Sequence, residues 1–290
     1  MRYATWKPAG GRAETFGIVR EDGTLIDLGR RLEGRCADLR QLIASGLHAE
    51  AASLAAGQHA DARLDDVHLS PPISHPGKIL CVGVNYPERN AEYNDGSEQP
   101  KYPSLFVRFP GSLVAHGEPI LRPPESAQFD YEGEIVLVIG KAGRRIAEAQ
   151  ALDHVFGLTL MNEGSVRDWL RHGKFNVTQG KNFDRSGSIG PWILTREAAG
   201  DLGALDLITT VNGEERQRGN TGTLMFSFAR IISYVSTFAS LEPGDLIATG
   251  TPPGAGARFN PPRWLVPGDV VEVTCPAIGT LRNRVADEAV

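Results

Sequence analysis

The chain has 290 residues, of which 41% are hydrophobic and 22% charged, and this is enough to bury a core without cross-links. Its formal net charge of −5 argues against a nucleic-acid-binding protein, which would show a basic face. It contains no apolar run near the roughly 20 residues of a membrane span, no signal peptide, and no metal-ligand spacing among its cysteines. We therefore expect a soluble, cytoplasmic enzyme or small-molecule binder, with no nucleic-acid or membrane partner.

Residues 1–75 predict a small α+β domain. Two short apolar stretches on either side of Asp22-Gly23 predict a β-hairpin. The apolar spacing of residues 36–56 predicts a helix, and Asp38 is suited to be its N-cap. Prolines and a glycine in residues 69–77 predict a linker to a second domain over residues 76–290.

The second domain is predicted to consist mainly of strands. Apolar, β-rich runs bounded by glycine or proline predict strands at 79–84, 104–108, 134–139, 158–163, 191–194, 207–211, 246–249 and 270–274. Helices are expected only at 146–153 and 225–240. Because strands dominate and no βαβ alternation is maintained, the predicted fold class is α+β, mainly β.

Three acidic residues are candidates for a metal site. Glu132 and Glu134 lie two residues apart at the start of an apolar strand, so their carboxylates would point to the same side. Two such charges need a cation between them, and oxygen ligands suit Mg²⁺, Mn²⁺ or Ca²⁺. Glu163, where another strand ends, could supply a third oxygen ligand. The alternatives are an exposed edge strand with alternating acids and, for Glu163, an acid at a helix N-terminus.

Two further segments could contact a substrate. Lys181, set between glycine and polar residues, could place a positive charge beside a substrate carboxylate or a developing enolate, or it could be an ordinary surface lysine. Residues 248–256 form a strand that runs into a loop rich in glycine and proline. There the backbone can approach a ligand, and Thr249 or Thr251 can donate a hydrogen bond.

Together these segments resemble the fumarylacetoacetate hydrolase family over residues 78–285. Each motif alone is weak, but their order and spacing are specific. The motifs are residues 82–86, 103–108, 130–134, 162–163 with 167–168, 180–181, 211–213 with 217, and 243–252.

The resemblance implies a mixed β-roll with a small N-terminal domain, usually in a homodimer. It implies Mg²⁺ or Mn²⁺ held by Glu132, Glu134 and Glu163, and a 2-oxo or 2,4-dioxo acid substrate assisted by Lys181. It places Thr251 at the substrate carboxylate. The remaining substrate-binding residues expected from the resemblance are Tyr86, Arg108, Gln217 and Gly250.

Two departures from the family pattern bear on the reaction. The third metal ligand of the family is usually aspartate, whereas this chain has Glu163. Family hydrolases often carry a His–Glu pair that activates water; here Glu92 is retained, but Arg89 replaces the histidine. Arginine is always protonated and cannot act as a general base.

Three explanations for Arg89 remain open. Glu92 activates water alone, with Arg89 lowering its pKa or binding a distal carboxylate. Alternatively, another base enters, with His116 and His172 as candidates. In the third case the reaction needs no attack by water.

The expected activity is therefore metal-dependent C–C bond hydrolysis of an acylpyruvate-type diacid. The first alternative is an isomerase, of the 2-hydroxyhepta-2,4-diene-1,7-dioate isomerase type, a tautomerase or a decarboxylase that acts through a metal-bound enolate. The second is a non-catalytic protein that binds 2-oxo acids.

Overall fold

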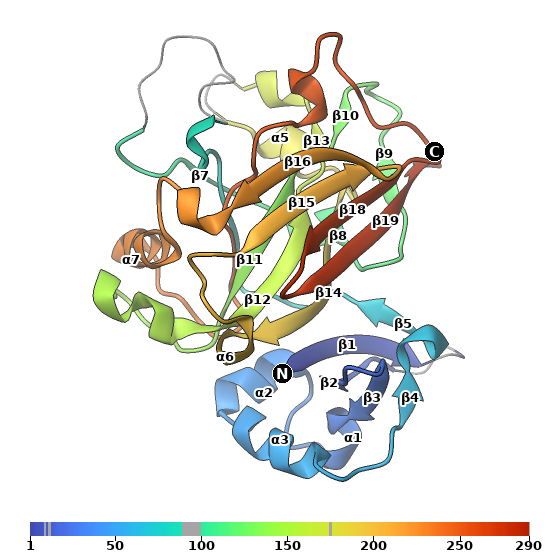
Figure 1. The fold of residues 1–290 in the computed structure, drawn as a ribbon, viewed down its shortest axis with the longest axis vertical. Coiled ribbons are helices and arrows are strands. Elements are labelled where there is room, and N and C mark those ends of the chain that lie inside the picture. The colour runs from blue at the N-terminus through green and yellow to red at the C-terminus, as the bar shows by residue number, and fades with distance from the viewer. Residues whose placement is uncertain (9, 11–12, 89–99, 174–175, 290) are drawn as a thin grey trace.

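The computed structural model describes residues 1–8, 10, 13–88, 100–173 and 176–289. A smaller part at the N-terminus packs beneath a larger, strand-rich part that contains the C-terminus (Figure 1). Arg89 and Glu92, expected near the reaction, lie outside the described residues.

The N-terminal part is built around a short antiparallel sheet and small helices. The predicted hairpin is confirmed, since Ile18 pairs with Ile26 and the Asp22 carboxylate accepts from the Thr24 amide at 3.0 Å. Its elements are β1 (Arg2–Pro8), β2 (Thr15–Val19), β3 (Thr24–Asp27), α1 (Leu28–Arg31), α2 (Leu39–Ser45), α3 (His48–Ala55), β4 (Ala62–Arg63) and β5 (Val67–Ser70).

The predicted helix over 36–56 is two helices rather than one. Asp38 is the N-cap of α2, as predicted, and accepts from the Gln41 amide at 2.7 Å. Gly46 ends α2 with φ of 73°, a left-handed conformation that costs glycine little. The predicted linker also differs, because its first residues belong to β5, which pairs with β1.

The described residues form a twelve-stranded sheet that extends from the N-terminal part into the larger part. Its path runs β4-β3-β2-β1-β14-β12-β11-β17-β6-β7, with β5 on β1 and β8 on β14. The strands beyond the N-terminal part are β6 (Ile79–Val82), β7 (Leu105–Val107), β8 (Leu113–Val114), β11 (Gly133–Ile139), β12 (Val155–Asn162), β14 (Gly187–Thr195) and β17 (Leu246–Ala248).

A second sheet packs on the first. Among the described residues it has five strands in the order β16-β15-β18-β19-β9. They are β9 (Ile120–Arg122), β15 (Asp206–Val211), β16 (Glu214–Asn220), β18 (Val270–Cys275) and β19 (Gly279–Asp287). A separate ladder joins β10 (Phe129–Asp130) to β13 (Ser165–Val166).

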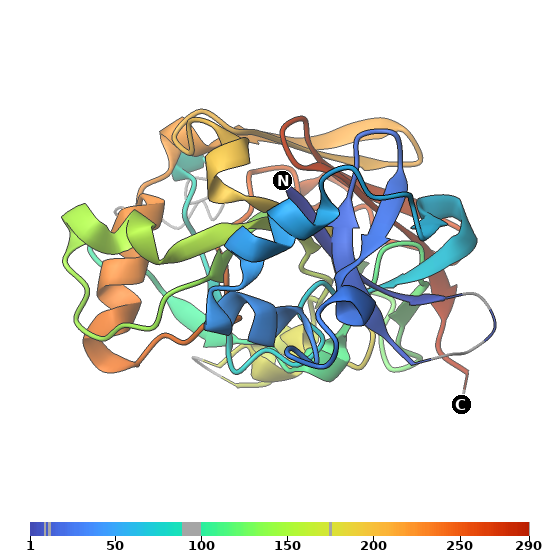
Figure 2. The ribbon, with the colours of Figure 1, turned by 90° about the horizontal axis from the view of Figure 1, so that it is seen from below.

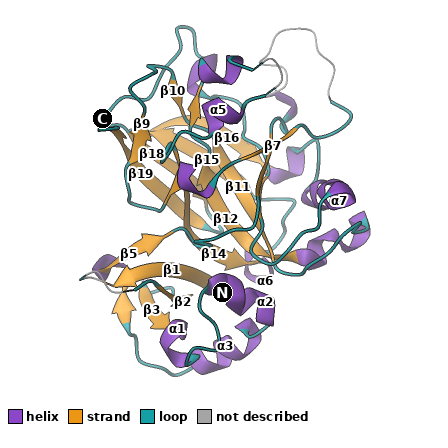
Figure 3. Cartoon of the chain, turned by 180° about the vertical axis from the view of Figure 1, so that it is seen from behind, coloured by secondary structure: helices purple, strands orange, loops and turns teal. Residues whose placement is uncertain are grey.

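Helices lie at the periphery of the strands (Figures 2 and 3). The helix expected at 225–240 is confirmed as α7 (Phe228–Phe238), but 146–153 forms a 3₁₀ segment, Glu148–His154, packed against it. The other helical elements are α5 (Thr178–Lys181), α6 (Arg196–Ala199) and 3₁₀ turns at Leu64–Asp66, Pro110–Ser112, Trp169–Arg171, Thr221–Thr223 and Gly256–Arg258. Within the described ranges, no helix has the length and apolar character needed to cross a membrane.

Strand β11 is the centre of the core, because every one of its residues is buried. Ile135 and Leu137 belong to the apolar cluster that includes α7 and the second sheet. Val136 and Val138, on the other face, belong to a cluster that includes the N-terminal part. A strand buried on both faces has little freedom to shift its register, so the residues at its start are rigidly placed.

Candidate active site

Three glutamates meet where the β11–β12 ladder ends. Gly133 pairs with Asn162, so Glu132 and Glu163 flank the same end, and the Glu163 amide donates to the Glu132 carbonyl at 2.7 Å. Glu132, Glu134 and Glu163 are 4%, 1% and 1% exposed. This burial excludes the exposed edge strand considered as an alternative for these acids. Carboxylates buried to this degree need compensating charge or protonation.

Two cationic side chains compensate part of this charge. The Lys181 ammonium group bridges Glu132 and Glu163, with Nζ 2.8 Å from Glu163 Oε2. Arg167 donates from Nη2 to Glu132 Oε1 and from Nε to Asp130 Oδ2, both at 2.7 Å. Burial acts to lower the pKa of Lys181, but the charges of Glu132 and Glu163 outweigh it and raise that pKa. Lys181 is therefore a buried cation, which excludes an ordinary surface lysine.

The two cations do not compensate all three glutamates. Burial, followed by the charges of Glu163 and Glu132, raises the pKa of Glu134 well above its ordinary value. Glu163 Oε1 is buried and has no hydrogen-bond partner. A divalent cation would compensate the buried Glu134 carboxylate and provide a partner for Glu163 Oε1. Because the candidate ligands are all carboxylate oxygens, they suit a hard cation such as Mg²⁺ or Mn²⁺.

The acids do not form a finished coordination shell. In the described part of the chain, no three acidic, histidine or cysteine side chains are arranged to hold a metal ion. The Lys181 ammonium group lies between two of the expected ligands. A bound ion would therefore share the site with this lysine or displace it.

A cavity of about 370 Å³, here called the lysine cavity, opens beside this cluster. Glu132, Arg167 and Lys181 form its polar wall, and Lys181 Nζ lies 5.2 Å from the centre of the Phe106 ring. The rest of the wall is formed by Gly83, Val84, Ser104, Leu105, Val107, Leu170, Asn176, Val177 and Thr178. Its volume is typical of a small-molecule site.

The loop that follows β17, at residues 249–256, contacts Glu134 through its backbone. The Gly250 amide donates to Glu134 Oε2 at 2.7 Å. The backbone of Gly250 has a positive φ of 105°. A Cβ at Gly250 would lie 2.6 Å from the Asn85 Cβ, so only glycine is accommodated there. Asn85 itself is fully buried and donates to the Thr249 carbonyl at 2.8 Å. The loop thus supports a candidate metal ligand through its backbone.

Thr251 and Gln217 fix the start of β11. Gln217 accepts from the Gly133 amide and donates to Thr251 Oγ1, both at 2.9 Å. Thr251 in turn donates to the Gly133 carbonyl at 2.9 Å. Neither residue lines the lysine cavity, and in this structure the Thr251 hydroxyl and the Gln217 amide form hydrogen bonds within the protein.

Arg108 and Tyr86, also expected to contact the substrate, are both buried in this structure. Arg108 is 2% exposed and donates to the Gly164 carbonyl at 2.9 Å and to Ser186 Oγ at 3.1 Å. Tyr86 is 2% exposed, and burial raises the pKa of its hydroxyl. Neither side chain lines the lysine cavity, and Arg108 stabilises the turn after Glu163 instead.

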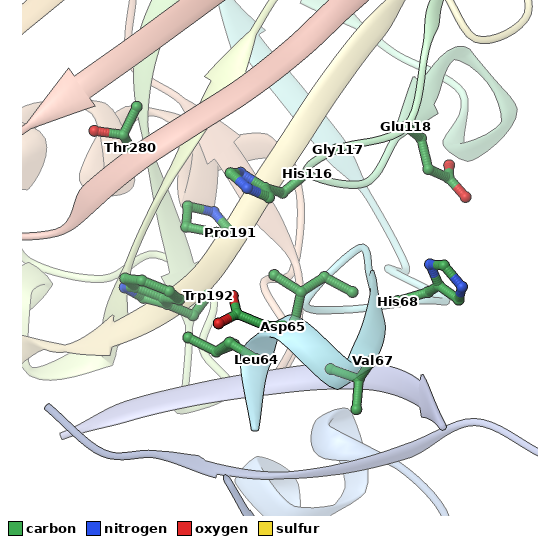
Figure 4. Close-up of a pocket in the computed structure, with 11 residues that line it drawn as sticks. Leu64, Asp65, Val67, His68, His116, Gly117, Glu118, Pro191, Trp192 and Thr280 are labelled. Atoms are coloured by element: carbon green, nitrogen blue, oxygen red, sulfur yellow. The ribbon is translucent and has the colours of Figure 1, made fainter. Parts of the chain in front are cut away.

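The two candidate histidines lie away from the lysine cavity. His116 lines a separate hollow of about 460 Å³, the histidine hollow, together with Asp65, Trp192 and Thr280 (Figure 4). His172 packs against Trp169 with ring centres 4.4 Å apart and the ring planes tilted by 43°. Since neither residue lines the cavity beside Glu132, the structure gives no support to either as the replacement base.

Residues 78–286 match the family model described as fumarylacetoacetate (FAA) hydrolase C-terminal. The chain belongs to the fumarylacetoacetate hydrolase family. This confirms the resemblance predicted from the motifs and makes the protein a member of an enzyme family that includes isomerases, tautomerases and hydrolases.

Relatives in the family differ in their named activities. The chain is 35% identical over 291 residues to oxaloacetate tautomerase fahd2, mitochondrial, of Xenopus laevis, covering 98% of this chain and 90% of that protein. A probable 2-hydroxyhepta-2,4-diene-1,7-dioate isomerase from Mycobacterium abscessus has the same fold, with TM-score 0.82, 33% identity and full coverage of both chains. Maleylpyruvate hydrolase from Sphingobium sp. SYK-6, in complex with manganese(II) and pyruvate, has TM-score 0.81 and 28% identity, again over the whole of both chains. The shared fold confirms the predicted α+β, mainly β class.

Two site residues had no assigned role in the sequence interpretation. Asp130 and Arg167 were noticed only as parts of family motifs, yet they form a buried ion pair that orients Glu132. Asp130 also accepts from the amides of Gly256 and Ala257, at 2.8 and 3.0 Å. The β10–β13 ladder brings the motifs of Asp130 and Arg167 together. This ladder is too short to be predicted from the periodicity of the sequence.

Proposed function

We propose that the protein is a divalent-metal-dependent tautomerase that interconverts the keto and enol forms of a 2-oxo diacid such as oxaloacetate. The observation that carries the proposal is the buried Lys181 ammonium group, held against Glu132 and Glu163 at the wall of the lysine cavity. The tautomerase named among the relatives, matched over nearly the whole chain, supports the choice of substrate.

Glu132, Glu134 and Glu163 are the residues that would hold Mg²⁺ or Mn²⁺. When bound, such an ion supplies Lewis-acid polarisation of the 2-oxo acid. The complex of the related maleylpyruvate hydrolase with manganese(II) and pyruvate supports this assignment. The substitution of glutamate for the usual aspartate at Glu163 keeps the charge of the ligand.

Lys181 would stabilise the charge that develops during enolisation. A base must take the proton when the C3–H bond breaks, and the retained Glu92 is the candidate from the sequence. Negative charge then moves to the C2 oxygen, and an N–H of Lys181 Nζ can donate to that oxygen. The raised pKa keeps Lys181 protonated and therefore able to donate. Arg167 holds Glu132 in place, so the carboxylate is not free to follow the substrate.

Arg89 favours tautomerisation over hydrolysis. Hydrolysis needs a base to activate water, and the guanidinium group that replaces the family histidine cannot accept a proton. Keto–enol exchange adds no water, so it is compatible with this replacement. Decarboxylation of the same substrate is a neighbouring outcome, because loss of the C4 carboxylate as CO₂ also moves negative charge to the C2 oxygen, although it leaves the enolate of pyruvate rather than that of oxaloacetate.

The C–C hydrolysis expected from the sequence is the second candidate. It is supported by the retained Glu92 and by the similarity to maleylpyruvate hydrolase. In this case Glu92 would activate water without a histidine partner. Release of pyruvate from an acylpyruvate distinguishes it from tautomerisation.

The test follows the enol absorbance of freshly dissolved oxaloacetate together with pyruvate release, with Mg²⁺ or Mn²⁺ and with EDTA. We expect a loss of absorbance that outpaces pyruvate formation, is abolished by EDTA, and falls by at least about 100-fold in Glu132→Ala. Glu21→Ala, an exposed turn residue, is the control. Full activity of Glu132→Ala would refute the assignment of the site, and binding without turnover would indicate a non-catalytic 2-oxo acid binder.

A further inference from the structure

A second hollow adjoins the lysine cavity. It has a volume of about 600 Å³ and is here called the arginine hollow. The two spaces share Arg167, Leu170 and Val177 in their walls. The two spaces are therefore adjacent, and a ligand that extends from Lys181 into the arginine hollow would pass these shared residues.

The arginine hollow is lined by positive charge. Arg167, Arg171 and Arg258 contribute guanidinium groups, and Gln128 contributes an amide. Among its described lining residues there is no carboxylate. Such a wall would attract an anionic group, since guanidinium binds carboxylates in a bidentate manner.

The nearby carboxylates are already engaged in hydrogen bonds within the protein. Asp130 accepts from Arg167 and from the amides of Gly256 and Ala257. Asp168 accepts from Ser126 Oγ at 2.6 Å and from the Trp169 amide at 3.2 Å.

The Arg171 side chain is available to a ligand. It is exposed, and within the described ranges it forms neither an ion pair nor a side-chain hydrogen bond. It is therefore the guanidinium in this wall that can turn toward a bound anion without losing another partner.

Apolar side chains line much of the space between the two charged ends. Of the three shared residues, Leu170 and Val177 are apolar, and Ala257, Pro262 and Trp264 extend the apolar surface within the arginine hollow. Methylene groups of a ligand would be buried there at a gain of roughly 0.8 kcal/mol each. The chemistry along this space is thus cationic, largely apolar and cationic again.

We propose that the arginine hollow binds the distal carboxylate of a 2-oxo diacid longer than oxaloacetate, with Arg171 as the specificity-determining residue. The proposal rests on the proposed function, because the 2-oxo acid end is taken to lie beside Lys181 and Glu132. The substrate class is then a 2-oxo diacid with an apolar chain between its two acidic ends.

The test measures binding by calorimetry in the presence of Mg²⁺. The ligands are 2-oxoglutarate, 2-oxoadipate and 2-oxopimelate, each paired with the 2-oxo monoacid of the same carbon number. Oxalate, which has no distal chain, reports on the 2-oxo acid end alone. The proteins are the wild type, Arg171→Gln, and Arg144→Gln, an exposed arginine that lines neither cavity.

We expect the wild type to bind at least one diacid about tenfold more tightly than its monoacid, and Arg171→Gln to lose most of this preference. Oxalate and the monoacids should bind both proteins within about twofold, and Arg144→Gln should behave as the wild type. Equal binding of diacids and monoacids by the wild type, or an unchanged preference in Arg171→Gln, would overturn the subsite. If oxalate fails to bind the wild type, the proposed function itself is wrong.

Discussion

Replacement of Lys181 by methionine tests whether its ammonium group compensates the buried glutamates. Methionine keeps most of the volume and removes the charge. Glu163 Oε2 then loses a partner at 2.8 Å, while its Oε1 already has none. Removing one member of a buried ion pair costs about 3–5 kcal/mol, because the other charge stays buried. At roughly 2 °C per kcal/mol for a chain of this size, the melting temperature should fall by about 6–10 °C.

Thermal unfolding in EDTA measures this effect. Lys141→Met is the matched control, because Lys141 is exposed and should change stability by no more than about 0.5 kcal/mol. Mg²⁺ should raise the melting temperature of Lys181→Met more than that of the wild type, since the ion supplies the missing positive charge. If Lys181→Met melts within about 1 °C of the wild type in EDTA, the ammonium group does not compensate the acids and the reasoning fails.

Two further predictions concern residues that hold the site and the N-terminal part in shape. Asn85→Ala should lower the free energy of unfolding by about 3–5 kcal/mol, because it leaves the buried Thr249 carbonyl and both backbone groups of Phe226 without their partner. Urea unfolding measures this, and a loss below about 1 kcal/mol would contradict it. Asp38→Ala should cost about 1 kcal/mol by removing the N-cap of α2, whereas Asp38→Ser should cost little; equal losses in the two variants would show that the cap is unimportant.

Local patterns predicted much of the fold. The hairpin at Asp22-Gly23, the N-cap at Asp38 and helix α7 each depend on neighbours in sequence, and each was found. The helix expected at 146–153 is a 3₁₀ segment, Glu148–His154, because the residues that favour an α-helix and a 3₁₀ helix are similar. Strand β19 was missed although it pairs with the neighbouring β18, because exposed charged residues alternate with its few buried ones and leave no apolar run.

The sequence predicted which charged residues gather at the candidate site, but not which partners the buried side chains around it contact. The order of the motifs pointed to Glu132, Glu134, Glu163 and Lys181, which the structure brings together. The use of Arg108 within the protein could not be predicted, because the Gly164 carbonyl that it contacts is placed by the turn after β12. Sequence spacing says nothing about which partner a buried guanidinium finds.

The pairing of β1 with β14 has a consequence for the evolution of the chain. Arg2 and Tyr3 pair with Leu194 and Ile193, so the small N-terminal part covers an edge of the sheet that carries the site. A protein begun at residue 78 would expose this edge, and unpaired edges promote aggregation. Insertions and recombination at the junction are therefore constrained by the need to keep that strand covered, even though the acids lie at the far end of the ladder.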